Sequence, residues 1–295
     1  MKILVLGANG MIGHRMWATL TEQGHQVFGL TRISDISPFT KIPGISLESS
    51  IPGIDVRDYE KLNQIIKDIE PHFVLNCVGI IKQVKASNIR EETIELNALF
   101  PHKLSEICKN NGAKMIQFST DCVFDGIDGD YNEACAPNAL DLYGQTKALG
   151  EVLDKSHVIT FRLSCIGREL NFHGGLVEWV RRQENKSISG FSQALYTGFS
   201  TQSLALILDK YFLNDNDLHG IIHLSSSVIN KYDLLNLINE KYSLNIDIKP
   251  DPSVVIKRNL NSESIKSKLN ISIPSWNEMI ADLSIDWDIY EEIYK

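Results

Sequence analysis

The chain has 295 residues, of which 43% are hydrophobic and 22% charged, an ordinary composition for a globular protein of one or two domains. Its formal net charge of −8 disfavours nonspecific binding to nucleic acid or an anionic membrane, and no apolar run approaches the ~20 residues of a membrane span. Five cysteines without paired metal-ligand spacing predict a reducing cytoplasmic setting and no metal site.

The N-terminal residues predict a dinucleotide-binding turn. Residues 2–6 form a short apolar run, which we expect to be a buried parallel strand and not a signal peptide. In the GANGMIG that follows, Gly7 permits a tight turn, Gly10 admits a pyrophosphate to the backbone, and Gly13 lets a helix over residues 11–23 pack closely. A glycine-rich turn without a ligand is the weaker alternative. The cofactor-binding residues expected here are Gly7, Asn9, Gly10, Met11, Ile12 and Gly13.

The end of the second strand bears on the choice of cofactor. This strand, HQVFGLTR, ends at Thr31 and Arg32. An NAD-preferring site typically has Asp or Glu there for the ribose 2′-hydroxyl, whereas Arg32 could pair with a 2′-phosphate. We therefore favour NADP over NAD, with a solvated surface arginine as the alternative.

Two further strand ends are expected to face the cofactor. After an irregular connection over residues 33–53, Asp55 and Val56 close a third strand, where Asp55 could accept from an adenine amino group. Asp58 is the better candidate to cap the next helix. The fourth strand is expected over residues 72–79, and the backbone at its end would pass over the nucleotide. The residues at that end are Cys77, Val78 and Gly79.

The fifth strand completes a predicted α/β sheet. It follows a long helix over residues 91–111, which carries Asn97 as a polar residue and ends at Gly112. The strand itself ends at Ser119, which we expect to contact the cofactor, and Thr120. Five strands alternating with helices predict a right-handed, doubly wound parallel sheet of the Rossmann type, with ligand at the carboxyl ends of the strands.

Three polar side chains converge at that edge. Tyr143 and Lys147 are four residues apart on a predicted helix, so they share one face with Cβ atoms about 5–6 Å apart. The Thr120 hydroxyl at the neighbouring strand end can meet them. A phenolic proton, a cation that eases its loss and an orienting hydroxyl suit proton delivery to a carbonyl oxygen while hydride reaches its carbon.

The C-terminal part has a different pattern. After a sixth strand expected over residues 157–167, short helices and strands alternate irregularly. We expect an NADP-binding Rossmann domain over residues 1–165. Residues 166–295 would form mainly a smaller, mixed α/β substrate lobe, with some segments returning to the Rossmann domain.

The chain resembles the extended short-chain dehydrogenase/reductase superfamily, and within it dTDP-4-dehydrorhamnose reductase and related sugar-nucleotide reductases. The resemblance rests on GANGMIG, DVRD, IELNALFPHKL, FSTDCVFDG and YGQTKALGE, in this order. It implies that Thr120 orients the substrate carbonyl, Tyr143 donates the proton, and Lys147 bonds the nicotinamide ribose and lowers the tyrosine pKa. NADPH would reduce the C4 ketone of a nucleotide-linked 4-keto-6-deoxy sugar. Asp55 and Asn97 fill positions that the family uses near the adenine and on the active-site helix.

Departures from that family lie on the sugar and nucleotide side. Cys122 and Cys165 replace aromatic residues, residues 197–205 lack an expected proline, and an Arg-Pro pair becomes Arg258-Asn259. They leave the ketoreductase chemistry intact and the exact substrate open. The substrate-binding residues expected are Asp121, Val123, Phe124, Asn171, Trp179 and Arg258.

Other functions fit parts of the pattern. In bifunctional epimerase-reductases a cysteine at the position of Cys122 shuttles protons, with a His or Lys from the second lobe as partner, and His173 is the nearest candidate. A 4,6-dehydratase is less favoured, because its Asp-Glu pair is Asp121-Cys122 here. A noncatalytic NADP-binding regulatory subunit is a third alternative, and a homodimer is compatible by fold analogy. We expect His14 on an exposed helix face.

Overall fold

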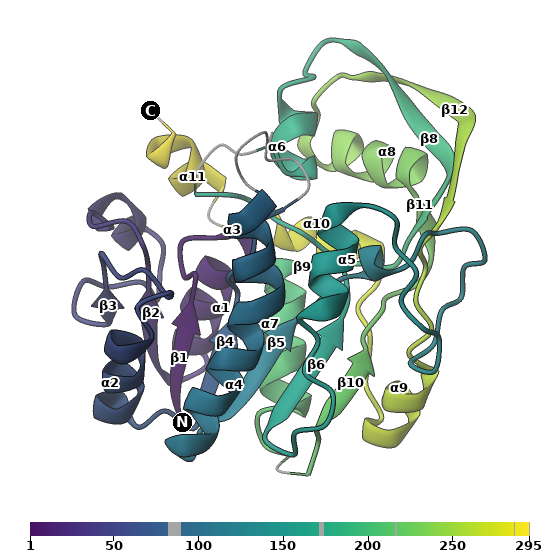
Figure 1. Cartoon of the computed structure of the whole chain (residues 1–295). Helices are drawn as coiled ribbons and strands as arrows, with labels where there is room; N and C mark the ends of the chain where they lie inside the picture. Colours follow the sequence, from purple (N-terminus) through teal and green to yellow (C-terminus); the bar gives the residue numbers. More distant parts are fainter. Residues whose placement is uncertain (82–89, 171–173, 216, 286, 295) are drawn as a thin grey trace.

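A seven-stranded parallel sheet forms the larger part of the protein, in the order β10-β6-β5-β4-β1-β2-β3 (Figure 1). The computed structural model describes residues 1–81, 90–170, 174–215, 217–285 and 287–294. The order confirms the predicted doubly wound fold and puts its reversal between β1 and β4, where such sheets bind ligands. The strands are β1 (Lys2–Leu6), β2 (Gln26–Leu30), β3 (Ser50–Ile51), β4 (Phe73–Asn76), β5 (Lys114–Phe118), β6 (Val158–Arg162) and β10 (Gly220–His223).

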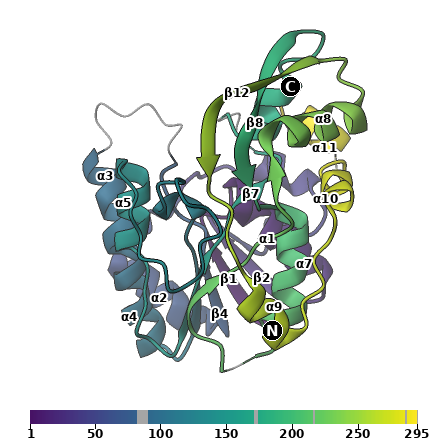
Figure 2. The ribbon, with the colours of Figure 1, turned by 90° about the vertical axis from the view of Figure 1, so that its right-hand side faces the viewer.

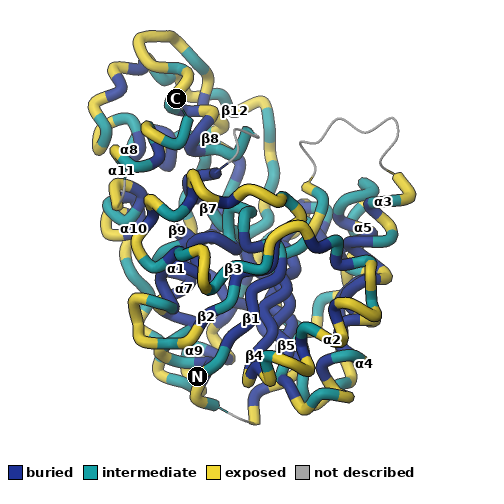
Figure 3. The backbone as a smooth tube through the Cα atoms, turned by 90° about the vertical axis from the view of Figure 1, so that its left-hand side faces the viewer, coloured by how far each residue is buried: buried dark blue, intermediate teal, exposed yellow. Residues whose placement is uncertain are grey.

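Helices cover both faces of this sheet because its strands are apolar on both sides. Along β1, Ile3 and Val5 join the core under α1 and α7, whereas Leu4 and Leu6 join the core under α2 and α4. Figure 3 shows the central strands as continuously buried. The helical segments are α1 (Met11–Glu22), η1 (Ser37–Lys41), α2 (Tyr59–Ile69), α3 (Arg90–Ile94), η2 (Glu95–Leu99), α4 (Phe100–Asn110), η3 (Asp121–Val123), α5 (Leu142–Leu149) and α7 (Thr201–Tyr211).

The expected helix over residues 91–111 is present as α3, η2 and α4 in succession, with η2 forming one π-helical turn. Gly112 follows its last residues with a φ of +69°, as a helix-ending glycine does. Asp58 caps α2 by accepting from the Lys61 N–H at 3.0 Å, which confirms that expectation.

A smaller three-stranded sheet, β11-β8-β12, lies beyond the carboxyl ends of the large sheet (Figure 2). Helix α8 packs against this sheet. The chain crosses between the two sheets where β10, which pairs with β6, is followed by β11, which pairs with β8. Its elements and the remaining ones are β7 (Cys165–Ile166), α6 (Leu176–Arg181), β8 (Ser187–Tyr196), β9 (Phe199–Ser200), β11 (Ile229–Asn230), α8 (Lys231–Tyr242), β12 (Asp247–Lys257), α9 (Glu263–Leu269), α10 (Trp276–Asp282) and α11 (Trp287–Ile293).

Three sequence-based expectations are wrong. The third strand does not end at Asp55 and Val56: β3 is Ser50–Ile51, inside the stretch expected to be an irregular connection, and Pro52 directly after it has no N–H to continue the ladder. The sixth strand does not run unbroken over residues 157–167: β6 ends at Arg162, and β7 pairs with β9 instead. The Ser164 carbonyl accepts from the Phe199 N–H at 2.9 Å, which draws the chain away from the large sheet. His14 is fully buried and not exposed, because Tyr290 of α11 covers it. Among the described residues, none of the helices has the length and apolarity to cross a bilayer.

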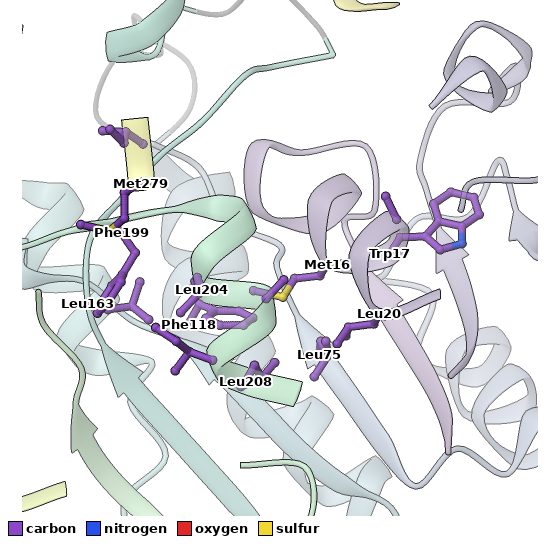
Figure 4. Packing of buried hydrophobic residues seen from close by; sticks show 14 of the residues in the cluster. Met16, Trp17, Leu20, Leu75, Phe118, Leu163, Phe199, Leu204, Leu208 and Met279 are labelled. Carbon is purple, nitrogen blue, oxygen red and sulfur yellow. The ribbon is translucent and has the colours of Figure 1, made fainter. Parts of the chain in front are cut away.

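The main core lies between the sheet and the α1–α7 layer. In Figure 4, Met16 and Leu20 of α1 lie near Leu75 of β4, and Leu204 of α7 lies near Phe118 of β5. Trp17 reaches the other side of α1 and covers β2. A Cβ built on Gly29 of β2 would lie only 2.3 Å from the Trp17 ring, so this position requires glycine for close packing.

We expect Gly29→Ala to lower the free energy of unfolding by about 1–3 kcal/mol, because the added methyl group overpacks the contact with Trp17. Urea denaturation measures the change. The double variant Gly29→Ala/Trp17→Leu should lose less than the two single variants together, since the smaller side chain relieves the clash. An unchanged denaturation midpoint in Gly29→Ala would contradict this account of the contact.

Candidate active site

The glycine turn after β1 is built for a close backbone approach. Gly7 has a φ of +69°, and a Cβ there would lie 3.1 Å from the Cys77 carbonyl at the end of β4. A Cβ on Gly13 would lie 2.2 Å from the Gly7 oxygen. Gly10 is the N-cap of α1, and no side chain of the described residues caps that helix. Its first N–H groups therefore suit an anion, and the residues fit the pyrophosphate of a dinucleotide.

The turn after β4 is held by Asn97. This side chain accepts from the Ile80 N–H at 2.8 Å and donates to the Ile80 carbonyl at 2.9 Å. It projects from the π-helical turn η2, a distortion often found at functional sites. A Cβ on Gly79 would lie 3.3 Å from the Asn97 Oδ1 and 4.0 Å from the Lys147 Nζ. Glycine at position 79 therefore keeps space open beside the lysine.

Two glycines fix the position of α5. A Cβ on Gly144 would lie 2.2 Å from the Cys122 oxygen, and a Cβ on Gly150 would lie 1.9 Å from the Asn97 oxygen. The helix is therefore packed against the backbone of both η3 and η2. Asp141 caps it by accepting from the Gly144 N–H at 3.1 Å. Position and start of α5 together determine where Tyr143 and Lys147 lie.

Thr120, Tyr143 and Lys147 meet at the carboxyl end of β5. The Thr120 hydroxyl accepts from the Cys122 N–H at 3.1 Å and donates to the Asp121 Oδ1 at 3.2 Å, and it acts to lower the pKa of the neighbouring Tyr143 phenol. Lys147 is buried, and its Nζ donates to the Phe118 carbonyl at 2.6 Å. The structure therefore brings together the three residues that the sequence placed in one site.

Burial controls the electrostatics of this group. Desolvation lowers the pKa of Lys147 to about 8, while Glu151 and Cys77 act in the opposite direction. Desolvation also raises the pKa of the Tyr143 phenol, which the hydrogen bond with Thr120 partly opposes. At neutral pH the arrangement therefore holds a protonated phenol near a buried ammonium group, a combination suited to general acid catalysis.

Two cations of the smaller lobe, Arg258 and Lys231, act on Cys122 and Asp121, which follow Thr120 in the chain. The Arg258 Nε donates to the Phe124 carbonyl at 3.0 Å, and its Nη1 lies 3.7 Å from the Cys122 sulfur. The Lys231 Nζ lies 3.6 Å from the centroid of the Tyr196 ring. Burial lowers the pKa of Lys231 to about 8, against the attraction of Asp121 and Cys122. Sequence reasoning missed Lys231, since no motif distinguishes it from other lysines at helix starts.

Cys122 and Asp121 face these cations. Burial raises the pKa of the Cys122 thiol to about 12, and Asp121 raises it further while Arg258 opposes the rise. Burial likewise raises the pKa of Asp121, which Lys231 and Arg258 counteract. Cys122 is therefore a neutral thiol at physiological pH, with very little thiolate present to accept a proton.

The other predicted cofactor residues make contacts of their own. The Arg57 guanidinium bonds the Asp55 carboxylate and thereby lowers the pKa of Asp55. Arg32 lies on the surface and pairs with Glu92, whose Oε1 is 3.4 Å from its Nη1. The Ser119 hydroxyl donates to Glu151 at 2.8 Å. The cofactor roles of Asp55, Arg32 and Ser119 stay predictions.

The predicted substrate residues are dispersed. Val123 and Phe124 are fully buried, and the Phe124 ring stacks on Tyr131 with centroids 4.1 Å apart. Trp179 lies on α6 with 38% of its surface exposed. Asn171 and His173 lie outside the described residues. In the described part of the chain no three His, Cys, Asp or Glu side chains are grouped to hold a metal ion.

The large parallel sheet with helices on both faces and the smaller mixed sheet define a Rossmann-like fold with an added lobe. A family profile described as "RmlD substrate binding domain" matches residues 1–285, and the chain belongs to this family.

Individual proteins are similar over different parts of the chain. The probable low-salt glycan biosynthesis reductase Agl14 of Haloferax volcanii is 30% identical over 152 residues, covering 51% of this chain and 48% of that protein. Methionine adenosyltransferase 2 subunit beta of Bos taurus is 26% identical over 150 residues, covering 51% and 41%. The chain thus matches about half the length of these curated relatives or less. The solved dTDP-4-dehydrorhamnose reductase of Bacillus anthracis, in complex with NADP, shares the fold with a TM-score of 0.77, 19% identity and coverage of 97% and 99%.

The lowered pKa of Lys147 predicts a pH dependence of stability. The unfolded chain takes up a proton near the ordinary lysine pKa of 10.5, whereas the folded protein does so only near 8. Between these values the unfolded state binds more protons, so the contribution of Lys147 to stability rises with pH, by up to about 1.4 kcal/mol per pH unit. Lys147→Met should flatten this rise, as measured by urea denaturation from pH 7.5 to 10.5. Parallel curves for the variant and the wild type would contradict the assignment.

Proposed function

We propose that the protein is an NADPH-dependent reductase that converts the C4 ketone of a nucleotide-linked 4-keto-6-deoxy sugar into an alcohol, for the synthesis of deoxysugar precursors of cell-surface polysaccharides. The observation that carries this proposal is the meeting of Thr120, Tyr143 and Lys147 beside a glycine turn that fits a dinucleotide. Family membership supports it, as do the names of two similar proteins, a glycan biosynthesis reductase and a dTDP-4-dehydrorhamnose reductase.

The chemistry needs one hydride and one proton. A bound nicotinamide would supply the hydride to the ketone carbon. As the C=O π bond opens, the ketone oxygen takes the phenolic proton of Tyr143, which leaves an alcohol and a phenolate. Lys147 stabilises that phenolate by its charge, and an ammonium group has N–H bonds beyond the one used by the Phe118 carbonyl. Thr120 holds the phenol in place and presents its hydroxyl to the substrate oxygen.

The second lobe would bind the nucleotide part of the substrate. Lys231 and Arg258 approach Cys122 and Asp121 from the smaller lobe, and cations there are complementary to a diphosphate. In this proposal residues 1–165 hold the cofactor and most of residues 166–295 hold the substrate, although β10 returns to the large sheet. The five cysteines are free thiols, which supports a cytoplasmic enzyme. A homodimer stays an expectation from fold analogy.

Two alternatives are weaker on the geometry. A bifunctional epimerase-reductase would need Cys122 as a proton shuttle, but the raised pKa of this thiol disfavours its use as a base. Lys231, with its lowered pKa, is the second-lobe residue that could partner it. A noncatalytic subunit is suggested by the relative from Bos taurus, and retention of Thr120, Tyr143 and Lys147 favours an enzyme instead.

We expect Tyr143→Phe to lower kcat by about 100-fold or more, because the ketone oxygen loses its proton donor. The measurement is NADPH oxidation with dTDP-, UDP- and GDP-linked 4-keto-6-deoxy sugars. The dissociation constant of NADPH should change much less than kcat, since the phosphate turn is intact.

Three results would count against the proposal. Full turnover in Tyr143→Phe would show that Tyr143 is not the proton donor. A wild-type protein that binds NADP but reduces no sugar nucleotide would favour the regulatory subunit. Deuterium found at C3 or C5 of the product after reaction in D2O would favour the epimerase-reductase, and Cys122→Ser should then lose that exchange while keeping reduction.

The preference for NADPH is tested at Arg32. We expect Arg32→Ala to weaken NADPH binding by about tenfold and to leave NADH binding nearly unchanged, because only NADPH carries the 2′-phosphate. Glu92→Gln is the matched control: it removes the carboxylate that now pairs with Arg32 and should not weaken NADPH binding. Equal loss of affinity for both cofactors in Arg32→Ala would exclude a 2′-phosphate contact.

A further inference from the structure

The C-terminal helix α11 packs against the helix that begins at the phosphate turn. Figure 1 shows it at the end of the large sheet where β1 ends. Arg168, which is only 3% exposed, holds it there. The Arg168 guanidinium carbon lies 4.1 Å from the centroid of the Trp287 ring and 4.7 Å from that of Tyr290, and its Nη2 bonds Glu291 at 3.2 Å.

A chain of hydrogen bonds leads from α11 to the turn. The Tyr290 hydroxyl lies 3.0 Å from the Arg15 Nη2 and 2.5 Å from the His14 Nε2, and the His14 Nδ1 lies 2.7 Å from the Gly10 oxygen. A carbonyl only accepts, so the Nδ1 carries a proton. Burial lowers the pKa of His14 to about 3, so the ring is neutral and its Nε2 accepts the Tyr290 proton. The donor and the acceptor of each hydrogen bond from Tyr290 to Gly10 are therefore fixed.

These hydrogen bonds end at the peptide group between Gly10 and Met11, whose N–H side faces the expected phosphate position. The Gly10 carbonyl and the Met11 N–H belong to one planar peptide group and point in opposite directions. The same carbonyl also accepts the first helical hydrogen bond, from the His14 N–H at 3.0 Å. Holding it from the His14 ring fixes the direction of the Met11 N–H at the start of α1, where that group would meet a bound anion.

We propose that Tyr290 and His14 are positioning residues for the dinucleotide pyrophosphate: α11 orients the Gly10–Met11 peptide through the Tyr290–His14–Gly10 hydrogen bonds. This proposal rests on the dinucleotide binding proposed above. It assigns to the C-terminal helix a part in cofactor affinity that is separate from its part in stability.

Tyr294 provides a matched control within the same aromatic group. Its ring centroid lies 5.6 Å from the Arg168 guanidinium carbon, and its hydroxyl bonds the Glu169 carbonyl and the Glu178 Oε1, the latter at 2.9 Å. Tyr290→Phe and Tyr294→Phe therefore each remove one hydroxyl beside Arg168, which is buried in Tyr290 and partly buried in Tyr294. Only the first removes a hydroxyl that bonds His14.

The experiment measures dissociation constants of NADPH and NADH by fluorescence titration of the full chain, together with the melting temperature without ligand. We expect Tyr290→Phe to weaken both cofactors by about three- to tenfold, the usual worth of one neutral hydrogen bond. KM for NADPH should rise by a similar factor and kcat should fall less. Tyr294→Phe should lower the melting temperature comparably and change neither dissociation constant by more than about twofold.

A second variant tests the route and guards against misfolding. His14→Leu should show the same loss of affinity, and Tyr290→Phe added to it should cause no further loss, because both act through one chain of bonds. Additive losses would overturn the proposal, as would unchanged affinity in Tyr290→Phe or equal losses in both tyrosine variants. A wild-type protein that binds neither cofactor would refute the proposed function itself, before any variant is compared.

Discussion

Close backbone contact at two glycines of α5 is the constraint on which the site depends. A side chain at position 144 or 150 would overlap a carbonyl oxygen of η3 or η2, so any larger residue would push the helix outward. Such a shift would carry the phenol of Tyr143 away from Thr120 and the amine of Lys147 away from the end of β5. The geometry of the reacting groups is therefore set by residues with no chemistry of their own.

The site combines charges from both lobes at low exposure. Lys147 approaches from the large sheet and Lys231 from the smaller lobe, and burial brings the pKa of each to about 8. Asp121 accepts from the Thr120 hydroxyl and is attracted by the second-lobe cations, and its raised pKa reflects the cost of burying a carboxylate. A phosphorylated ligand entering this region would add negative charge and so favour the protonated form of both amines.

Local signals explain what the sequence could predict. The glycine turn, the Asp58 cap and the start of the helix bearing Tyr143 each depend on residues close together in the sequence. A short stretch of sequence is therefore enough to predict them. The positions that were missed depend on distant segments. His14 is covered by a tyrosine 276 positions away, and Lys231, at the start of α8, interacts electrostatically with Asp121 and Cys122 more than 100 residues earlier in the chain. No window of sequence contains both partners of such a contact.

The place of β10 in the large sheet has a consequence for folding during synthesis. Its partner β6 is an edge strand until β10 is made, and the chain between the two includes β7, α6, β8, β9 and α7. A nascent chain would therefore present an unpaired strand edge to its surroundings for that interval, which is a known route to misassociation. Expression at lower temperature, or with chaperones that shield such edges, should improve the soluble yield of this protein.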